Sequence, residues 1–559
     1  MVGMEVSELV RLLLGRRGVT EPDAIEKFLT PDFGRDTHDP FLLHDMERAV
    51  SRVFAAIVQD EKIAIYADFD CDGIPGAAVL HDFFKKIGHS NFEIYIPHRD
   101  REGYGFHIKA IEELAKRGAS LIITVDVGTT AIAAVKRAKA LGIDVIVTDH
   151  HEIKDVLPDA IAVVNPKLGD YPFRDPCGAA VAWKLVQALV REGKRLKYPV
   201  FEALPEGWEK WLLDLVAIAT VADLVPLVGE NRALTHFGLK VLRKSPRLGI
   251  QALCSRARLR QSDITEETIA FSFAPRINAA SRMDEPEVAF SLLTTADEEE
   301  SEHCAAHLER LNVKRRGVVG ALVREAKRRI KIRFNERDRL VVLGDTEWKP
   351  ALMGLAANSI MEERGGVVCM WGRDAIGRLK GSCRSDGSVS IVDLFSNARE
   401  AFEEFGGHAK SGGFTVSRES VHTLHDVLLD TLQNMQTEEA DQESGDHDAQ
   451  IELSEFGFPL LEEVSRLAPF GIGNPKPVFL VSGVSVSSVR RFGREGNHIE
   501  VFVSCERTGA RARAFNFFRV LEDFTYAPAV GSSARILATV EHDTFRRDLA
   551  LRLVDVLSP

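Results

Sequence analysis

The feature that most constrains the fold is a run of five short apolar segments between residues 62 and 167, separated by helical stretches. The apolar segments read KIAIYAD, FEIYIP, SLIITVD, DVIVTD and AIAVVN, and the stretches between them include AIEELAKRG and AIAAVKRAKALG. Apolar strands that alternate with helices are typical of βαβ units and a parallel sheet. We therefore predict an α/β fold whose parallel sheet carries helices on both faces.

Acidic patches follow the apolar segments, and we expect all of them at strand ends. In open α/β sheets, the carboxyl ends of the strands line the crevice where ligands bind. Carboxylates are ligands for hard divalent cations, with an occasional imidazole for Mn²⁺, and two such cations suit phosphodiester hydrolysis. The patches are DFDCDG with Asp68, Asp70 and Asp72, TVDVGTT with Asp126, TDHHE with Asp149, His150 and His151, and ATVADLVPL with Asp223.

Each patch taken alone has a simpler interpretation. A single Asp after a strand is more often a helix N-cap, and a His-His pair is more often a surface or structural feature. The ordered series on successive strands is much harder to obtain from capping alone, so we favour a metal site.

Composition excludes few functions. The formal net charge of −12 at first opposes nucleic-acid binding, but residues 437–455 carry eight acids and no Lys or Arg, so the excess is local. Seven cysteines without CxxC spacing indicate a reducing cytoplasm and argue against a zinc site. No apolar run is long enough for a membrane helix, and the N-terminus reads as an amphipathic helix, not as a signal peptide.

The pattern along the chain predicts six segments. Apolar residues at helical spacing across roughly 298–337 indicate one long connecting helix, and short strands with Gly and Pro turns near the C-terminus indicate a small barrel. The segments are a helical lead-in (1–49), the parallel-sheet domain (50–240), a helical connector (241–337), a smaller α/β domain (338–435) in which GGHAKSGG forms a turn, an acidic linker (436–450) and a β-barrel (451–559).

The four acidic motifs, in this order, resemble the phosphoesterase motifs of the DHH superfamily. Further blocks resemble its RecJ branch, the single-strand-specific exonucleases, and the resemblance extends from about residue 50 to the C-terminus. These blocks are PHRDREGYG (97–105), VVNPK (163–167), GENR (229–232), PRINAASRM (275–283), GSCRS (381–385), GGHAKSGG (406–413) and PFGIGNPKPVF (469–479). The resemblance implies a DHH domain joined by the long helix to a DHHA1 domain, followed by an OB-fold.

The resemblance also implies two divalent cations, Mn²⁺ or Mg²⁺, and a role for each residue of the acidic motifs. Asp70 would bind one cation, and Asp126 would bridge the two. The second cation would be held by Asp72, His150 and Asp223. Asp68 and Asp149 would support the ligands, and His151 would contact the scissile phosphate.

Residues outside the acidic motifs would bind the substrate. By resemblance, Arg99, Ser382 and Arg384 would hold a 5′-terminal phosphate, and the groove would be lined by Arg276, Asn278, Arg282 and His408. The simpler interpretation of an isolated arginine is a solvated surface charge. Tyr104 would either stack on a base or fill the core. Exposed barrel residues, namely Arg490, Arg491, Phe492, Arg511, Arg513 and Phe515, would bind single strands.

The chain departs from the family pattern at three places. Ser281 stands where the family usually has Gly, Ala351 replaces another Gly, and GGHAKSGG, with Lys410-Ser411, stands where the family usually has GGHAxAAG. None of these positions is an expected metal ligand, so we expect them to change rate or substrate details.

The sequence therefore predicts a cytoplasmic, monomeric 5′→3′ exonuclease that is specific for single-stranded DNA, releases mononucleotides and acts in recombination and repair. Single-strand-binding protein and a RecQ-type helicase are the partners that the family implies, and no membrane association is expected. Two alternatives remain open: a phosphodiesterase for short oligonucleotides or cyclic dinucleotides, and a non-catalytic single-strand-binding scaffold.

Overall fold

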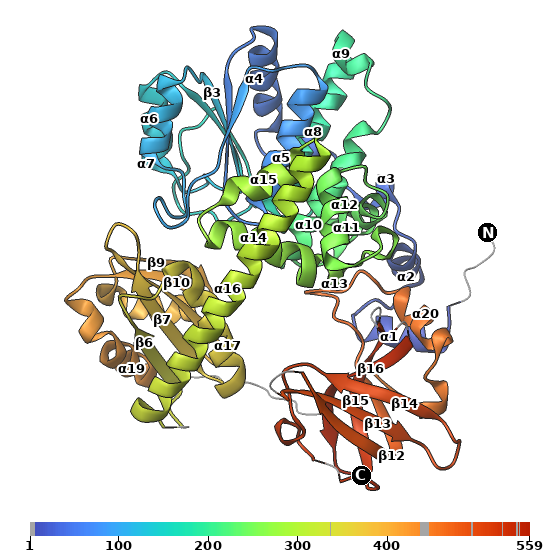
Figure 1. Cartoon of the computed structure of the whole chain (residues 1–559). Coiled ribbons are helices and arrows are strands. Elements are labelled where there is room, and N and C mark those ends of the chain that lie inside the picture. Colours follow the sequence, from blue (N-terminus) through green and yellow to red (C-terminus); the bar gives the residue numbers. More distant parts are fainter. Residues whose placement is uncertain are drawn as a thin grey trace. The chain divides into compact units, whose positions relative to one another are not determined.

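The computed structural model describes residues 6–335, 337–435, 447–493, 496–527, 529–543, 546 and 548–559. The chain divides into two compact units, shown in Figure 1. The larger unit comprises residues 39–223 and 238–441, and the smaller comprises 1–38, 224–237 and 442–559. Most of the predicted acidic linker, residues 436–446, lies outside the described residues.

The first sheet of the larger unit is entirely parallel, which confirms the predicted α/β class. Its strand order is β2-β1-β3-β4-β5. Alternate residues of a strand point to opposite faces of the sheet, so Ala64 and Tyr66 of the first strand pack with α6 and α7. Helices α4, α5 and α8 cover the opposite face (Figure 1). The elements are α4 (Met46–Val58), β1 (Ile63–Ala67), α5 (Gly73–Lys86), β2 (Phe92–Tyr95), α6 (Ile108–Lys116), β3 (Leu121–Val125), α7 (Ile132–Ala140), β4 (Asp144–Thr148), β5 (Ala162–Val164) and α8 (Gly178–Arg195).

A helical region follows, and it ends in the long helix that the charged segment predicted. Helix α16 runs from Glu298 to Arg333, is capped by the Asp297 side chain, and carries acids in its first turn and bases in its last. The preceding helices are α9 (Pro199–Glu202), α10 (Leu213–Ala222), α11 (Gly229–Leu242), α12 (Leu248–Ala257), α13 (Glu266–Thr268), a π-helical turn (Ile269–Phe273), α14 (Ala274–Arg282) and α15 (Pro286–Thr294).

The second sheet has the strand order β6-β7-β8-β10-β9, in which only β6 and β7 pair in parallel. Helix α17 and the end of α16 cover one face, while α18 and α19 pack on the other. The Gly-rich segment expected as a turn forms most of the β9–β10 hairpin. The bounds are β6 (Leu340–Gly344), α17 (Pro350–Arg364), β7 (Val367–Arg373), β8 (Leu379–Ser385), α18 (Ile391–Asn397), β9 (Glu404–His408), β10 (Ser411–Val416) and α19 (Leu424–Asn434).

The smaller unit is built around a closed five-stranded barrel, as predicted. The ring runs β12-β13-β14-β16-β15 and closes through a β12–β15 pairing, and β11 adds to β12 outside it. Val10, Leu13 and Leu14 of α1 belong to its core, so the first helix is part of this unit. The elements are α1 (Glu8–Gly15), α2 (Pro22–Leu29), α3 (Phe33–Asp36), β11 (Ala449–Ile451), α20 (Phe458–Ser465), β12 (Phe479–Phe492), β13 (His498–Ser504), β14 (Arg511–Asn516), β15 (Ser533–Asp543) and β16 (Asp548–Leu557).

Among the helices of the described residues, none has both the length and the apolar character needed to cross a membrane.

Candidate metal centre and substrate site

The loop after β1 holds the first three aspartates. Asp70 Oδ1 accepts hydrogen bonds from the backbone N–H groups of Asp72 and Gly73, at 2.8 and 3.1 Å. A Cβ atom at Gly73 would lie 2.3 Å from the carbonyl oxygen of Asp68, so only glycine fits there. The loop therefore turns tightly and keeps its carboxylates on the same side of the sheet edge.

The start of α8 contacts two of the carboxylates, Asp72 and Asp126. The Asp72 carboxylate accepts hydrogen bonds from the backbone N–H groups of Gly178 (2.6 Å) and Ala179 (2.7 Å). Asp126 follows β3 with a positive φ of 62°, a conformation that costs a non-glycine residue energy. A Cβ atom at Gly178 would lie 2.8 Å from Asp126 Oδ1, so this glycine lets α8 approach both aspartates.

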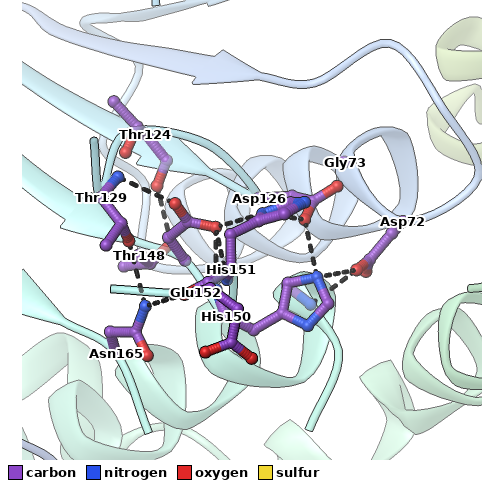
Figure 2. Close-up of polar contacts among 12 residues, drawn as sticks. Asp72, Gly73, Thr124, Asp126, Thr129, Thr148, His150, His151, Glu152 and Asn165 are labelled. Atoms are coloured by element: carbon purple, nitrogen blue, oxygen red, sulfur yellow. Dashed lines mark hydrogen bonds and ion pairs between the residues drawn. The ribbon is translucent and has the colours of Figure 1, made fainter. Parts of the chain in front are cut away.

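The Asp149-His150-His151 loop is held by its own hydrogen bonds, many of which Figure 2 shows. Asp149 is buried, and its Oδ2 accepts from the Thr129 N–H at 2.8 Å. Its Oδ1 accepts from the backbone N–H of His150 and from Nδ1 of His151, both at 2.8 Å. The Asn165 amide donates to the His151 carbonyl and to the Thr129 hydroxyl, both at 3.0 Å. Asp149 thus orients the His151 ring and holds the backbone at His150.

Side chains from the four motifs converge around His150, and Figure 2 shows Asp72 and Asp126 near its ring. His150 Nε2 lies 3.2 Å from Asp126 Oδ1, 3.6 Å from Asp223 Oδ2 and 3.7 Å from Asp72 Oδ2. Three groups of side chains could each hold a cation, with ligand atoms within 4.8 Å of one another. They are Asp72-His150-Asp223, Asp68-Asp70-Asp126 and Asp126-His150-His151. Asp126 and His150 each belong to two of these groups, so the groups overlap at these two side chains.

Asp223 reaches this cluster from a helix, so the expectation that it ends a strand is wrong. It directly follows α10 (Leu213–Ala222), a helix whose residues are almost all buried. A helix that is apolar all round reads like a buried strand, because its apolar run has no visible period.

The electrostatics of the cluster fit divalent cations. Burial and mutual repulsion raise the pKa values of Asp68, Asp126 and Asp223 well above the usual range, and they raise that of Asp72 to about 7. The Oδ1 atoms of Asp68 and Asp126 are buried and have no hydrogen-bond partner among the described residues. Crowded carboxylates with free lone pairs are the donor set that Mn²⁺ and Mg²⁺ prefer.

The two histidines differ in charge and in partners. Burial and the neighbouring His151 lower the pKa of His150 to about 3, so its neutral ring can offer Nε2 to a cation. Burial would also lower the pKa of His151, but the Asp149 hydrogen bond outweighs it and raises the value to about 9. The hydroxyl of Tyr104 lies 3.3 Å from His151 Nδ1. Tyr104 is 54% exposed, which rules out the core-filling alternative for this ring.

Arginines from four segments of the chain gather beside the acidic cluster. Arg99 stacks on the Phe69 ring, with its guanidinium carbon 4.8 Å from the ring centroid. Burial and the charges of Arg99, Arg315 and Arg384 lower the pKa of Arg282 to about 9, whereas the nearby Asp70 acts in the opposite direction. The charges of the metal loop, which is the loop after β1 with Asp68, Asp70 and Asp72, therefore act on the guanidinium of Arg282.

Gly354 of α17 leaves space for the residues expected to hold a terminal phosphate. A Cβ atom at this position would lie 2.7 Å from Arg384 Nη2 and 3.5 Å from Ser382 Oγ. Both residues lie on β8, and Arg384 Nη1 donates to the Cys383 carbonyl. A glycine here therefore leaves room for the Arg384 guanidinium against α17.

The other expected groove residues lie in different surroundings. Arg276 forms an ion pair with Glu309 at 2.7 Å, so its guanidinium is already engaged. Asn278 Oδ1 accepts from the Cys71 N–H at 3.1 Å, and thus anchors the metal loop from α14. His408 is exposed on β9.

The departures from the family pattern also have defined environments. Ser281 is buried, and its hydroxyl has no hydrogen-bond partner among the described residues. The Ala351 carbonyl accepts from Arg282 Nη1 at 2.7 Å. Lys410 lies in the β9–β10 hairpin, and its carbonyl accepts from the Ser385 N–H.

Sequence reasoning missed two contributors to this site. Gly178 touches Asp126 and binds Asp72, yet it lies far from both in sequence. Arg315 acts on Arg282 from the long helix, where one more basic residue in a charged segment carries no signal.

Comparisons with known proteins agree with this arrangement. The model of the DHH family, N-terminal domain, matches residues 62–220, the DHHA1 domain matches 337–434, and the RecJ OB domain matches 447–555. The single-stranded-DNA-specific exonuclease RecJ of Haemophilus influenzae is 30% identical over 538 residues, which are 93% of this chain and 92% of that protein. This chain belongs to the RecJ family. The predicted family and fold are thereby confirmed.

Other RecJ proteins extend the comparison. RecJ of Bacillus subtilis is 35% identical over 92% of this chain, which spans only 63% of that relative's length. A crystal structure of Thermus thermophilus RecJ in complex with Mn²⁺ matches all of this chain and 77% of that chain, with a TM-score of 0.79 and 27% identity. A second structure of that RecJ is a complex with Mg²⁺. Divalent cations of the predicted kind thus bind in this family.

Proposed function

We propose that this RecJ protein is a metal-dependent exonuclease that degrades single-stranded DNA from its 5′ end and releases mononucleotides. The observation that carries the proposal is the position of an arginine beside the carboxylate-histidine centre, since Arg99 stacks on Phe69 of the DFDCDG loop with its guanidinium carbon 4.8 Å from the ring centroid. In a site of this kind, the arginines can bind a phosphate, and the carboxylate-histidine centre can hydrolyse a phosphodiester bond.

Two cations would be held by the carboxylates and His150, with Asp126 shared between them. When bound, they supply a water of lowered pKa and stabilise the charge on the phosphate oxygens. The protein contributes fixed ligands, because Asp72 is held by two backbone N–H groups and Asp70 by two others. Asp149 turns the His151 ring so that its Nε2 can donate to the scissile phosphate.

The end of the strand would be gripped by Arg99, Ser382 and Arg384, whose donors suit a terminal phosphate. Arg384 has no carboxylate partner among the described residues, and burial lowers its pKa, so an anion would relieve its desolvation. Exposed Tyr104, next to His151, would stack on a base near the scissile bond. Together these contacts would place the first internucleotide phosphate over the metal centre.

The barrel would hold the strand farther from its end. Phe517 and Phe518 are 40% and 78% exposed, and Arg552 stacks on the Phe517 ring at 4.9 Å. Exposed rings and guanidinium groups bind single strands without sequence preference. Arg513 and Phe515, expected to contribute, are buried, and Arg513 pairs with Asp543 and Asp548 instead.

This activity would serve DNA recombination and repair in the cytoplasm. The protein would act as a monomer on strands exposed by a RecQ-type helicase and covered by single-strand-binding protein. These partners are implied by the family, and the strand specificity agrees with the names of the related proteins.

Digestion with Mn²⁺ of a long single strand labelled at its 3′ end, its matched duplex and a dinucleotide tests the proposal. We expect the 5′-phosphorylated single strand to shorten progressively, while the duplex persists. Cleavage of the dinucleotide alone would favour a short-oligonucleotide phosphodiesterase. Asp126→Ala should abolish cleavage but leave strand binding, and a strand that stays intact with the native protein would refute the exonuclease.

A further inference from the structure

Arg315 is a cationic residue of the long helix α16 to which no role has been assigned. Its side chain is half-buried, burial lowers its pKa, and its Nε atom is shielded from solvent without a hydrogen-bond partner among the described residues. Asn312, three residues earlier on the same helix face, has a buried Oδ1 in the same condition. A helix face with two unsatisfied buried polar groups is unfavourable in the absence of a ligand.

The surroundings of Arg315 add to this cost. It lies close enough to Arg282 to lower the pKa of that guanidinium, as do Arg99 and Arg384. Within the described part of the chain, none of these four guanidinium groups forms an ion pair with a carboxylate, and the hydrogen bonds of Arg282 and Arg384 go to backbone carbonyls. Desolvated like charges persist only where something offsets them, and an anionic ligand is the direct way to do so.

Arg282 is influenced by both parts of this cluster. Arg99 and Arg384 belong to the proposed terminal-phosphate site, whereas Arg315 reaches Arg282 from α16, which packs against α14 (Figure 1). A guanidinium group is suited to phosphate oxygens, because its fork of donors can bind two of them at once. A phosphate between Arg282 and Arg315 would be a different one from the terminal phosphate.

We propose that Arg315, together with Arg282, binds an internal phosphate of the single strand. The inference rests on the proposed function for its ligand. In this proposal, Arg315 of the connecting helix α16 becomes a strand-binding residue. Arg282 and Arg315 would contact the same internal phosphate.

The decisive comparison is between Arg315→Met and Arg316→Met. Arg316 is the neighbouring residue, its side chain is 61% exposed, and its nearest carboxylate is Glu309 at 3.9 Å. Binding of a fluorescent 5′-hydroxyl single strand is measured at several salt concentrations in an Asp126→Asn background, which preserves the probe. We expect Arg315→Met to weaken binding about tenfold or more and to reduce the salt slope by about 0.7, the value for one lost phosphate contact. Arg316→Met should change the affinity by less than about twofold and leave the salt slope unchanged.

Three further measurements separate binding from a structural role. In the active protein, Arg315→Met should raise KM about tenfold and leave kcat nearly unchanged, because the lost contact is to bound strand. Its melting temperature should stay equal or rise, since an unpaired buried charge has been removed, whereas a structural arginine would lower it. Arg315→Lys, a safeguard if the Met variant does not fold, should keep the salt slope but bind more weakly than the native protein.

Unchanged affinity and salt slope in Arg315→Met would overturn the inference. So would a lowered melting temperature with normal binding. The binding assay does not depend on cleavage, so a protein that fails to shorten the strand would contradict the proposed function while the Arg315 result still stands.

Discussion

Replacing Gly178 by alanine should slow the enzyme about 100-fold without changing any cation ligand. The added Cβ would lie 2.5 Å from the Cβ of Asp126, 2.8 Å from its Oδ1 and 2.9 Å from its Cα. Ordinary carbon contacts are about 3.5–4.0 Å, so Asp126 or the start of α8 must move by about 1 Å. The same movement disturbs Asp72, whose carboxylate accepts a 2.6 Å hydrogen bond from Gly178.

The displacement sets the expected size of the effect. A misplacement of about 1 Å at a reacting centre costs on the order of 100-fold in rate, and disturbing a residue that orients ligands weakens metal binding about 10- to 100-fold. Overpacking should also lower the free energy of unfolding by about 1–3 kcal/mol. We therefore expect kcat of Gly178→Ala to fall about 100-fold, with weaker Mn²⁺ binding by calorimetry and a cooperative thermal transition.

Gly317→Ala is the matched control, since Gly317 also lies in a helix but a Cβ there meets nothing within 4 Å. This variant should be more stable by about 0.5–1 kcal/mol and fully active. A folded Gly178→Ala protein with native kcat and Mn²⁺ affinity would refute the view that α8 positions Asp126.

Three other predictions follow from the site and its surroundings. Removing metal with a chelator should abolish cleavage, and Mn²⁺ at 100 times its Kd should restore it and stabilise the fold by about 2.7 kcal/mol, so an unchanged Tm would contradict the cation site. Tyr104→Phe should keep the native KM, whereas Tyr104→Ala should raise it about tenfold or more through the lost base stacking; equal values for both would exclude stacking. Burial would raise the pKa of Asp82, but His81 and Arg247 outweigh it and lower the value, so its stabilisation is present above the unfolded pKa and is lost as pH falls. Asp82→Asn should therefore lower the free energy of unfolding in urea by about 1–3 kcal/mol at neutral pH and by much less near pH 3. A loss of stability that is independent of pH would count against the ion pair between Asp82 and Arg247.

The parallel sheet could be predicted from sequence because its strands are buried on both faces. Such strands appear as unbroken apolar runs, and the helices between them have their own period. The acidic residues after β1, β3 and β4 could be placed for the same reason, since parallel strands end at one edge of the sheet. Asp223 followed a similar apolar run, yet that run is a helix buried on all sides, and periodicity cannot separate the two cases.

Contacts between distant segments could not be predicted. Gly178 carries no side chain, so nothing in its type shows that it touches Asp126, and its function is visible only once α8 is placed. Arg276 was expected in the groove, but it pairs at 2.7 Å with Glu309 of α16, two helices later in the chain. Pairings of this kind depend on helix packing, which a single sequence does not encode locally.

The barrel unit has a consequence for how the protein is made. Val10, Leu13 and Leu14 of α1 pack in a core that is otherwise built from residues 449–556. At about 5–20 residues per second, the ribosome finishes α1 roughly 20–90 s before the barrel strands emerge. During that interval the apolar face of α1 has no partner from its own core, so the nascent chain is open to chaperone capture or misassembly. Deletion of α1 should leave a barrel with an incomplete core even though every strand is present.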